Sequence, residues 1–245
     1  MKLVALIPAR WASSRFPGKP LALIMGRPMI EHVYRRALAI PEIDEVHIAT
    51  DSLEIQQAAR SFGGRVVLTR PEHPSGSDRL AEASDILGLA DEDIVLNIQG
   101  DQPAFNPDQP ALLARALKED PGLEMATLAI ALTTARDIHN PDHVKVAFGE
   151  DRYALYFSRA PIPWPRDGEG EYHRHVGIYA YRAAFLRRFV SLPEGRLERL
   201  ERLEQLRALE NGARIKVVIV SGLSPEVDVP ADLAAAEEAL RLESH

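Results

Sequence analysis

Three basic side chains lie close together near the amino end of the chain, in the stretch PARWASSRFPGKPL at residues 8–21. They are Arg10, Arg15 and Lys19, and two prolines and a glycine lie among them. Arginine offers planar pairs of donors that match phosphate oxygens, and lysine supplies a point charge. The glycine spacing fits neither a P-loop nor a dinucleotide-binding fingerprint. The residues therefore predict a polyphosphate-binding loop, with a solvated loop whose charges pair with nearby acids as the alternative.

Two aspartates that are far apart in the sequence follow apolar runs and are candidate ligands for a metal–nucleotide complex. Asp101 comes directly after DIVLNIQG, and Asp228 lies in EVDVPADL, after the last apolar run. Mg²⁺ in proteins takes one or two carboxylates together with water and substrate phosphates. The alternatives are a turn-forming residue for Asp101 and an acid at a helix start, before Pro230, for Asp228. Sequence spacing alone does not indicate that the two carboxylates meet.

Further polar residues follow small residues or strand-like runs and suggest contacts with a ligand. Ser75 and Gly76, in PSGSD, allow close approach of the backbone, although a helix cap explains them equally well. Arg159, in YFSRAPIPW, could grip a carboxylate with two parallel hydrogen bonds, or form a surface ion pair. His173 and His175 could chelate a transition metal, but no thiol or third ligand is evident, so packing in a strand is favoured.

The elements that must position these residues alternate between apolar runs and amphipathic stretches in the first half of the chain. We expect strands at 2–8, 45–50, 65–69 and 93–101, and helices at 28–39, 53–62 and 77–88. This rhythm predicts an α/β fold, a Rossmann-like mostly parallel sheet with helices on both faces. Ligands of such sheets bind beyond the carboxyl ends of the strands.

The second half of the chain has shorter helical intervals and more strand-like runs. We expect strands at 124–132, 144–148, 154–158 and 175–182, helices within 182–190 and 196–211, then a strand at 214–220 and a helix at 231–242. The sequence therefore predicts three parts. They are a nucleotide-binding α/β half (1–125), a mixed-sheet α/β extension (126–213), and a last core strand and helix that return to the first half (214–245).

Composition excludes several classes of protein. The 245 residues carry a net charge of −7, which argues against a nucleic-acid or anionic-membrane partner. No cysteine is present, so disulfides, thiolate metal sites and cysteine nucleophiles are excluded. No apolar run reaches membrane-spanning length, and the apolar run at the amino end is too short for a signal sequence. A cytoplasmic protein is the expectation.

Eight stretches of the chain, in order and with compatible spacing, resemble the sugar-activating cytidylyltransferases. They are IPARWASSRFPGKPL, ATD, PSGSDRLAE, NIQGDQP, ALYFSRAPIPW, RHVGIYAYR, LEQLRAL and VDVPADL. The resemblance implies in-line transfer of CMP from CTP to the anomeric 2-hydroxyl of an acidic sugar, with release of pyrophosphate. The sugar it favours is 3-deoxy-D-manno-octulosonate (Kdo), for lipopolysaccharide biosynthesis. Sialic acid, 8-amino-Kdo and a non-catalytic nucleotide-binding module on the same fold are the alternatives.

The resemblance also implies a role for individual residues. Catalysis falls to Lys19, Asp101 and Asp228, and the two aspartates hold Mg²⁺. The implied nucleotide-binding residues are Ala9, Arg10, Arg15, Lys19, Ser75, Gly76, Arg79 and Gln99. The implied sugar-binding residues are Gln102, Arg159, His175, Tyr179, Glu204 and Gln205. Gln102 stands where the family commonly has glutamate, which puts one sugar contact in doubt. Members of this family are commonly homodimers built through the second-half extension, and we expect the same here.

Overall fold

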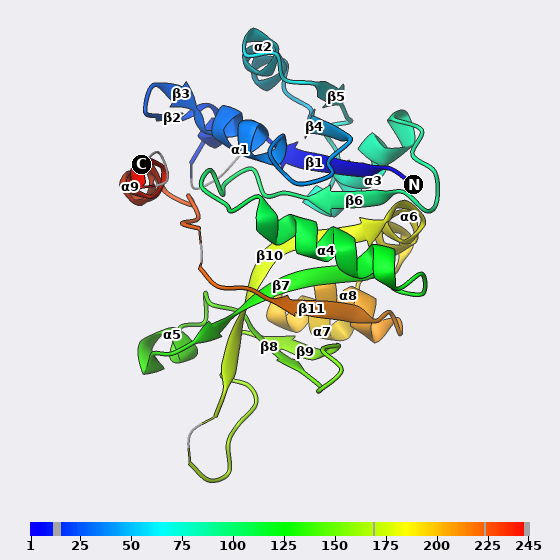
Figure 1. The fold of residues 1–245 in the computed structure, drawn as a ribbon, viewed down its shortest axis with the longest axis vertical. Helices are drawn as coiled ribbons and strands as arrows, with labels where there is room; N and C mark the ends of the chain where they lie inside the picture. The colour runs from blue at the N-terminus through cyan, green and yellow to red at the C-terminus, as the bar shows by residue number, and fades with distance from the viewer. Residues whose placement is uncertain (12–15, 169, 223, 243–245) are drawn as a thin grey trace.

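The computed structural model describes residues 1–11, 16–168, 170–222 and 224–242 of the chain (Figure 1). Within these residues, nine strands form one sheet, whose main path runs in the order β11-β7-β10-β6-β1-β4-β5. The path consists of β1 (Leu3–Ala9), β4 (Glu45–Thr50), β5 (Val66–Leu68), β6 (Ile94–Asn97), β7 (Met125–Leu132), β10 (Tyr172–Arg182) and β11 (Ile215–Ile219). The short strands β8 (Lys145–Phe148) and β9 (Ala154–Ser158) join through β10, and a separate hairpin contains β2 (Leu23–Ile24) and β3 (Arg27–Pro28).

The main sheet is mostly parallel, which confirms the predicted fold class. β1 pairs in parallel with β4 and β6, β4 with β5, and β11 with β7, whereas β10 runs antiparallel to both of its neighbours. Apolar residues point to both faces of these strands. Along β1, Leu3, Ala5 and Ile7 belong to one core cluster, and Val4 and Leu6 belong to the other. The sheet is therefore covered on both sides, as parallel sheets require.

Helices cover the two faces of this sheet (Figure 1). The helices are α1 (Met29–Ala37), α2 (Leu53–Ser61), α3 (Gly76–Ile86), α4 (Asp108–Glu119), α5 (Ala135–His139), α6 (Ala183–Ser191), α7 (Arg196–Glu201), α8 (Gln205–Glu210) and α9 (Leu233–Leu242), with 3₁₀ turns at Lys19–Leu21 and Pro230–Asp232. Apolar side chains of α1, α2 and α4 join the first core cluster, and those of α3, α6 and α8 join the second. None of the helices in the described part of the chain is both long and apolar enough to cross a membrane.

The sheet does not stop at the predicted boundary after residue 125. β7 and β10, which the sequence assigned to a separate extension, lie inside the main sheet, with β10 between β6 and β7. The carboxyl-terminal half of β10 is apolar on both sides, and Ile178, Ala180 and Tyr181 are buried there. The amino-terminal half extends beyond β6 and stays paired with β7, and there Arg174 pairs with Lys145 of β8. β10 therefore connects the nucleotide-binding half to the extension.

The expected single helix over 196–211 is wrong, because the chain breaks into α7 and α8. Arg202, between the two helices, has a φ of 55°, and its backbone N–H caps α7 by donating to the carbonyl of Glu198. A left-handed residue ends an α-helix and turns the chain. The side chain of Arg207 in α8 then returns to α7, where two hydrogen bonds join it to the carboxylate of Glu198. The break leaves Glu204 as the cap residue of α8.

Candidate active site

Lys19 stands between two carboxylates that come from distant parts of the chain. Its Nζ lies 2.9 Å from Asp101 Oδ2 and 3.6 Å from Asp228 Oδ1, and it also donates to the carbonyl of Val227 at 2.9 Å. Lysine charge next to two ionised acids lowers the repulsion between them. The structure thus brings together the three residues to which the resemblance gave catalytic roles.

Backbone contacts explain how the two aspartates meet. Asp101 follows β6 at the carboxyl edge of the sheet, beside the end of β1. A Cβ at Gly100 would lie 3.0 Å from the carbonyl of Pro8, so glycine allows this close approach of the two strand ends. The segment after β11 returns to this point, where the N–H of Val227 donates to the carbonyl of Asp101 at 2.9 Å. Asp228 is the next residue.

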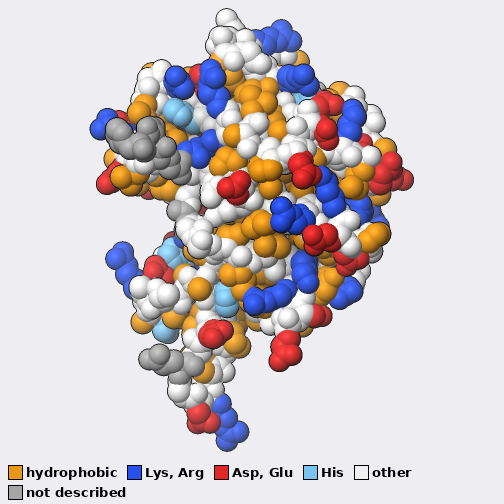
Figure 2. Space-filling view, in the orientation of Figure 1, with side chains coloured by type: hydrophobic (Ala, Val, Ile, Leu, Met, Phe, Trp, Pro, Cys, Tyr) orange, Lys and Arg blue, Asp and Glu red, His pale blue; other side chains and the backbone are white. Residues whose placement is uncertain are grey.

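An apolar cluster under the same edge holds this returning segment in place. Val227 is fully buried there with Ile24 and Met29, and α9 contributes Ala236 and Leu240. Figure 1 places α9 beside the β2–β3 hairpin, at the end of the sheet to which β1 points. The molecular outline is indented on this side, between α9 and α5 (Figure 2). The position of Asp228 therefore depends on the packing of the last helix.

The donor set at this point suits Mg²⁺ better than a transition metal. Both carboxylates remain partly exposed, with 30% of the Asp101 side chain and 43% of the Asp228 side chain accessible. Within the described ranges, no group of three or more histidine, cysteine or acidic side chains has metal-binding geometry. Two carboxylates that leave room for water and phosphate oxygens form the ligand set that Mg²⁺ prefers. The residues present therefore fit this ion.

The basic loop lies against a second loop that precedes α3. Ala9 is the buried last residue of β1, and Nη2 of the following Arg10 lies 3.5 Å from the carbonyl of Pro74. Ser75 caps α3, because its hydroxyl accepts the N–H of Asp78 at 3.2 Å. Arg15, the third basic residue of the predicted loop, lies outside the described residues. Arg10, Ser75 and Gly76 are thus placed on adjoining loops, beside the end of β1.

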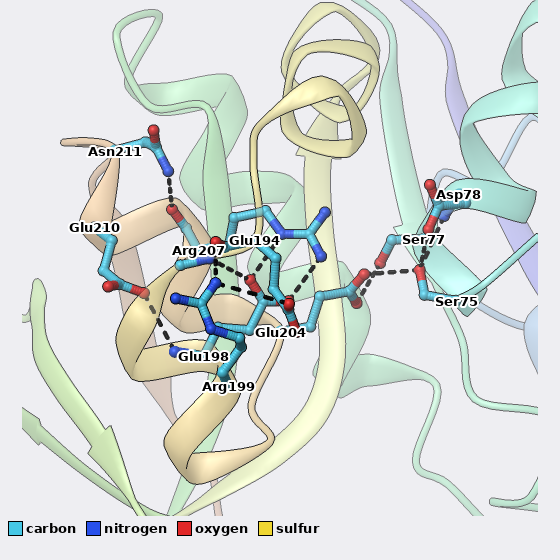
Figure 3. A network of polar contacts seen from close by, with 11 residues as sticks. Ser75, Ser77, Asp78, Glu194, Glu198, Arg199, Glu204, Arg207, Glu210 and Asn211 are labelled. Carbon is cyan, nitrogen blue, oxygen red and sulfur yellow. Dashed lines mark hydrogen bonds and ion pairs between the residues drawn. The ribbon is translucent and has the colours of Figure 1, made fainter.

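Glu204 joins the loop before α3 to the helix pair of the extension. Its carboxyl group contacts Ser75 and Ser77 (Figure 3). Its oxygens lie 2.7 Å from Ser75 Oγ and 2.8 Å from Ser77 Oγ. Burial raises the pKa of the Glu204 carboxyl above its ordinary value. The neighbouring Gln205 is buried, and its side-chain nitrogen makes no hydrogen bond within the described part of the chain. A residue expected on the sugar side is thus in direct contact with a residue expected on the nucleotide side.

Arg79 does not occupy the position that the resemblance implied. Its side chain is fully buried, donates to Thr69 Oγ1 at 2.6 Å and lies 3.3 Å from Asp51 Oδ2. Burial lowers the pKa of this guanidinium. The side chain therefore fastens α3 to the ends of β4 and β5. A direct contact with a nucleotide, as predicted, disagrees with this burial.

Arg159 is likewise engaged away from Lys19. Its Nε donates to the carbonyl of Glu201 at 2.8 Å, and its Nη1 donates to the carbonyl of Pro141 at 3.1 Å. The buried Nζ of Lys145 donates to the carbonyl of Arg159 itself at 2.6 Å. The guanidinium is thus held by backbone carbonyls of the extension, so a sugar carboxylate would have to displace these contacts.

The two glutamines near Asp101 serve neighbouring segments of the protein. Gln99 Nε2 donates to the carbonyl of Gly177 at 2.9 Å, next to the irregularity in β10. Gln102 is buried, and its Nε2 donates to Glu226 Oε1 at 3.1 Å. Glu226 in turn lies 3.5 Å from Nη2 of Arg174. Gln102 therefore helps to hold the segment before Asp228, and its predicted contact with a sugar is not available while it is buried.

His175 and Tyr179 lie together on one face of β10, as the alternation of the strand predicted. Their ring centroids are 5.3 Å apart, and Phe157 packs edge-on against the histidine. Burial lowers the pKa of His175 to about 3, so the ring is neutral. Thr127 Oγ1 donates to the carbonyl of Ile178 and lies 3.0 Å from His175 Nε2, so this nitrogen carries the ring proton.

Sequence reasoning missed two charged residues beside the carboxylates. Glu226 and Arg174 form an ion pair that contacts Gln102. Burial, followed by the charge of Asp101 among the other acids nearby, raises the pKa of the Glu226 carboxyl. The only signal in the sequence was the charge of Glu226, two positions before Asp228. A charged residue at that position fits a buried ion pair and a solvated side chain equally well.

Comparisons with known proteins point to one family. A family profile described as cytidylyltransferase matches residues 4–215. A 3-deoxy-manno-octulosonate cytidylyltransferase of Syntrophus aciditrophicus (strain SB) is 52% identical over 241 residues, 98% of this chain and 97% of its own length. An 8-amino-3,8-dideoxy-manno-octulosonate cytidylyltransferase of Shewanella amazonensis is 50% identical, over 99% of this chain and 100% of its own.

Solved structures give the same result. A CMP:2-keto-3-deoxy-manno-octonic acid synthetase in complex with CTP superposes with a TM-score of 0.95 and 44% identity, covering 99% of this chain and 100% of the other. A 4-diphosphocytidyl-2C-methyl-D-erythritol synthase reaches a TM-score of 0.66 at 15% identity, covering 98% of each chain, and shares the fold alone. From the match to the profile and the identity to these relatives, the chain belongs to the cytidylyltransferase family.

Proposed function

We propose that this chain transfers CMP from CTP to the anomeric 2-hydroxyl of Kdo, a step of lipopolysaccharide biosynthesis. The observation that carries the proposal is the meeting of Lys19, Asp101 and Asp228 at one point of the sheet edge. The chain is similar over nearly its whole length to relatives that bear the name of this activity. One cation beside two carboxylates, at the carboxyl ends of parallel strands, suits the chemistry of a nucleoside triphosphate.

In the proposed reaction, the hydroxyl oxygen of the sugar attacks the α-phosphorus of CTP in line. The bond from the α-phosphorus to the bridging oxygen breaks, pyrophosphate leaves with the electron pair, and the hydroxyl proton is released. Arg10 and Lys19 would bind the β- and γ-phosphates and stabilise the charge that develops on them. Positioning of the two substrates supplies much of the remaining rate, and no covalent intermediate with the protein is needed.

Asp101 and Asp228 would hold Mg²⁺. Their shared contact with Lys19 supports this assignment, since two carboxylates that accept one cation from the same direction can accept another. When bound, Mg²⁺ neutralises phosphate charge and lowers the pKa of the attacking hydroxyl. The backbone hydrogen bond from Val227 to Asp101 keeps the two carboxylates close to each other.

A second candidate substrate is 8-amino-Kdo. Relatives named for this sugar are 50% and 49% identical to the chain, nearly the same as relatives named for Kdo. The two sugars share the carboxylate and the anomeric hydroxyl and differ at the far end. The same reaction chemistry therefore serves both, and discrimination rests on contacts with the tail of the sugar.

A substrate panel tests the proposal. The purified protein is incubated with CTP and Kdo, 8-amino-Kdo or sialic acid, with and without Mg²⁺, and pyrophosphate release is measured. We expect release with Kdo and Mg²⁺, and none after chelation of the ion. Faster release with 8-amino-Kdo would assign the second candidate. Absence of release with every sugar would instead indicate a nucleotide-binding module without catalysis.

We also propose that the protein acts as a homodimer in the cytoplasm. Three of the most exposed large apolar side chains belong to the predicted extension, namely Leu155 (69% exposed), Trp164 (76%) and Leu200 (68%). Exposed apolar side chains that gather into one contiguous patch are commonly covered by a partner. A cytoplasmic location would give the enzyme access to CTP.

A further inference from the structure

The carboxyl group of Glu204 is shared between two functional segments. Glu204 caps α8 in the extension, and its side chain reaches the amino end of α3 in the nucleotide-binding half (Figure 3). There it contacts Ser75 Oγ at 2.7 Å through Oε1 and Ser77 Oγ at 2.8 Å through Oε2. Because this carboxyl contacts both segments, its protonation state matters for both.

The hydrogens available at Ser75 show that the carboxyl groups of Glu204 and Asp78 cannot both be ionised. Ser75 Oγ accepts the N–H of Asp78 and lies 2.6 Å from Asp78 Oδ2 and 2.7 Å from Glu204 Oε1. A hydroxyl has one hydrogen, and ionised carboxylates only accept. With both acids ionised, one short oxygen–oxygen contact would contain no hydrogen. A proton on one carboxyl removes this conflict, because that acid donates to Ser75 and Ser75 donates to the other.

Asp78 is the acid better suited to remain ionised. It lies in the first turn of α3, where the helix dipole favours negative charge, and it forms a local cap with Ser75. The proton then belongs to Glu204. Ser77 donates to its second oxygen, which leaves every oxygen of the carboxyl group with a partner of the right kind.

The charges around Glu204 agree with this choice. Burial is the main cause that raises its pKa, and the nearby charge of Asp78 acts in the same direction. Arg207 of α8 acts in the opposite direction, but its guanidinium is already paired with Glu198 through bonds of 2.9 and 2.7 Å. From β10, the uncharged Tyr179 and Tyr181 face the carboxyl.

We propose that Glu204 carries a proton in the resting protein and, as a neutral acid, positions Ser75 beside the nucleotide site. The hydrogen bonds then run from Glu204 to Ser75 and from Ser75 to Asp78. They hold the sugar-side helix α8 and the nucleotide-side loop as one unit. The part of this inference that concerns the two substrates rests on the proposed function, whereas the location of the proton does not.

Infrared spectroscopy tests where the proton lies. Wild type, Glu204→Gln and Asp78→Asn are titrated, and the carbonyl band of a protonated carboxyl is followed in difference spectra. We expect a band that Glu204→Gln lacks, that Asp78→Asn keeps, and that is still present at pH 7. Absence of this band at pH 7 overturns the proposal, and so does a band that disappears only in Asp78→Asn.

A second measurement does not need the glutamine variant to fold. Wild-type protein labelled with ¹³C at the glutamate carboxyl is titrated by NMR, with Ser77→Ala as the assigning variant, since Ser77 contacts this carboxyl. We expect one resonance with a raised midpoint that moves in Ser77→Ala. Two results would show that the proton is not on Glu204. Either no resonance has a raised midpoint, or no resonance with a raised midpoint moves in Ser77→Ala.

CTP binding without sugar tests the positioning role separately. Calorimetry compares wild type with Glu204→Gln from pH 5 to pH 9, so that titration of the nucleotide cancels in the ratio of affinities. We expect the affinity of wild type, relative to the variant, to fall as pH rises through the Glu204 midpoint. A constant ratio overturns the positioning role. If CTP does not bind at all, the proposed function fails, while the spectroscopic result on the proton still stands.

Discussion

Lys19 offsets part of the negative charge of two acids that are brought together by folding. Its side chain is only 15% exposed, and its ammonium contacts Asp101, Asp228 and a backbone carbonyl at once. Two carboxylates at such a short separation repel each other in a partly buried site. The lysine therefore has two functions in the proposed enzyme, to stabilise the free protein and to bind phosphate when the triphosphate arrives.

The first prediction concerns turnover. Lys19→Met should lower turnover by about 10²-fold or more, because a fixed donor to the leaving phosphates is lost. The measurement is pyrophosphate release at saturating CTP and sugar. Lys118→Met is the matched control, since Lys118 pairs with Glu42 on the surface. A loss well below tenfold in Lys19→Met would place this lysine outside the reaction.

The second prediction uses the same variant without nucleotide. Lys19→Met should bind Mn²⁺ more tightly than wild type does, because the ammonium no longer competes for the two carboxylates. Free Mn²⁺ is measured by electron paramagnetic resonance. Adding Asp101→Asn to Lys19→Met should abolish the gain. Equal or weaker binding in Lys19→Met would show that the lysine and the ion do not share a position.

The third prediction concerns acid stability. The folded pKa of His175, about 3, is lower than its ordinary value of 6.5, so folding favours the neutral ring. The stability that this provides is present above pH 6.5 and is lost as pH falls toward 3, by up to about 1.4 kcal/mol per pH unit. Urea unfolding from pH 7 to pH 4 should be less dependent on pH in His175→Gln. His139→Gln, at an exposed site, is the control, and equal slopes in wild type and His175→Gln would contradict the prediction.

Residue roles could be inferred from the sequence only in part. Lys19 and Asp101 were recognisable because a stiff basic loop and a strand end are local features. Arg79 and Arg159 were assigned to ligands, yet one is buried against Asp51 and the other binds backbone carbonyls. An arginine has the same type and spacing in either case, so only its long-range partners distinguish a ligand contact from an internal one.

At the scale of elements, the parallel strands were the most predictable. β4 was expected at 45–50 and has these bounds, because a parallel strand that is covered on both faces is a run of buried residues between turns. The gap between α7 and α8 was not predictable. Leucines recur through 197–209 without interruption, and only Arg202 takes the left-handed conformation that turns the chain. That turn also places Glu204, so the sequence could not indicate its contact with Ser75.

The fourth prediction compares two helix caps. Ser52 caps α2 and Ser75 caps α3 through similar hydrogen bonds of 3.2 Å, so the loss of either cap should cost about 1 kcal/mol of folding free energy. Ser75→Ala should cost more in total, because it also loses the contact with Glu204. Only Ser75→Ala should also reduce the additional stability that CTP provides, because this cap belongs to the nucleotide loop. Urea unfolding with and without CTP gives both quantities. An equal CTP effect in the two variants would remove Ser75 from the nucleotide site.

At the scale of the whole molecule, the fold class was predictable and the position of β10 within the main sheet was not. The alternation of strands and helices determines a covered parallel sheet. The insertion of β10 between β6 and β7 depends on contacts between segments about 80 residues apart, such as Tyr179 opposite Asn97. One half of β10 is apolar and the other half is polar, so its sequence is compatible with a place in the main sheet and with a place in the extension. In the structure, β10 belongs to both.

The fifth prediction concerns assembly. Wild type should sediment as a dimer, and the double change Leu155→Asp, Leu200→Asp should give a monomer, because it introduces charge into the exposed apolar surface of the extension. Analytical ultracentrifugation measures the mass. Leu53→Asp is the control, since Leu53 is 67% exposed on α2, in the other half of the chain. A dimer that survives the double change would locate the interface elsewhere.

The return of the segment after β11 to Asp101 has a consequence for synthesis of the protein on the ribosome. A growing chain completes β1 and β6 early, but it obtains Asp228, the second acid proposed to hold Mg²⁺, only when residue 228 has emerged, and α9 must still pack behind it. A translation product that stops short would retain most of the sheet and lack Asp228. Such fragments would lack one of the two acids proposed for the reaction, so only the completed chain would be active.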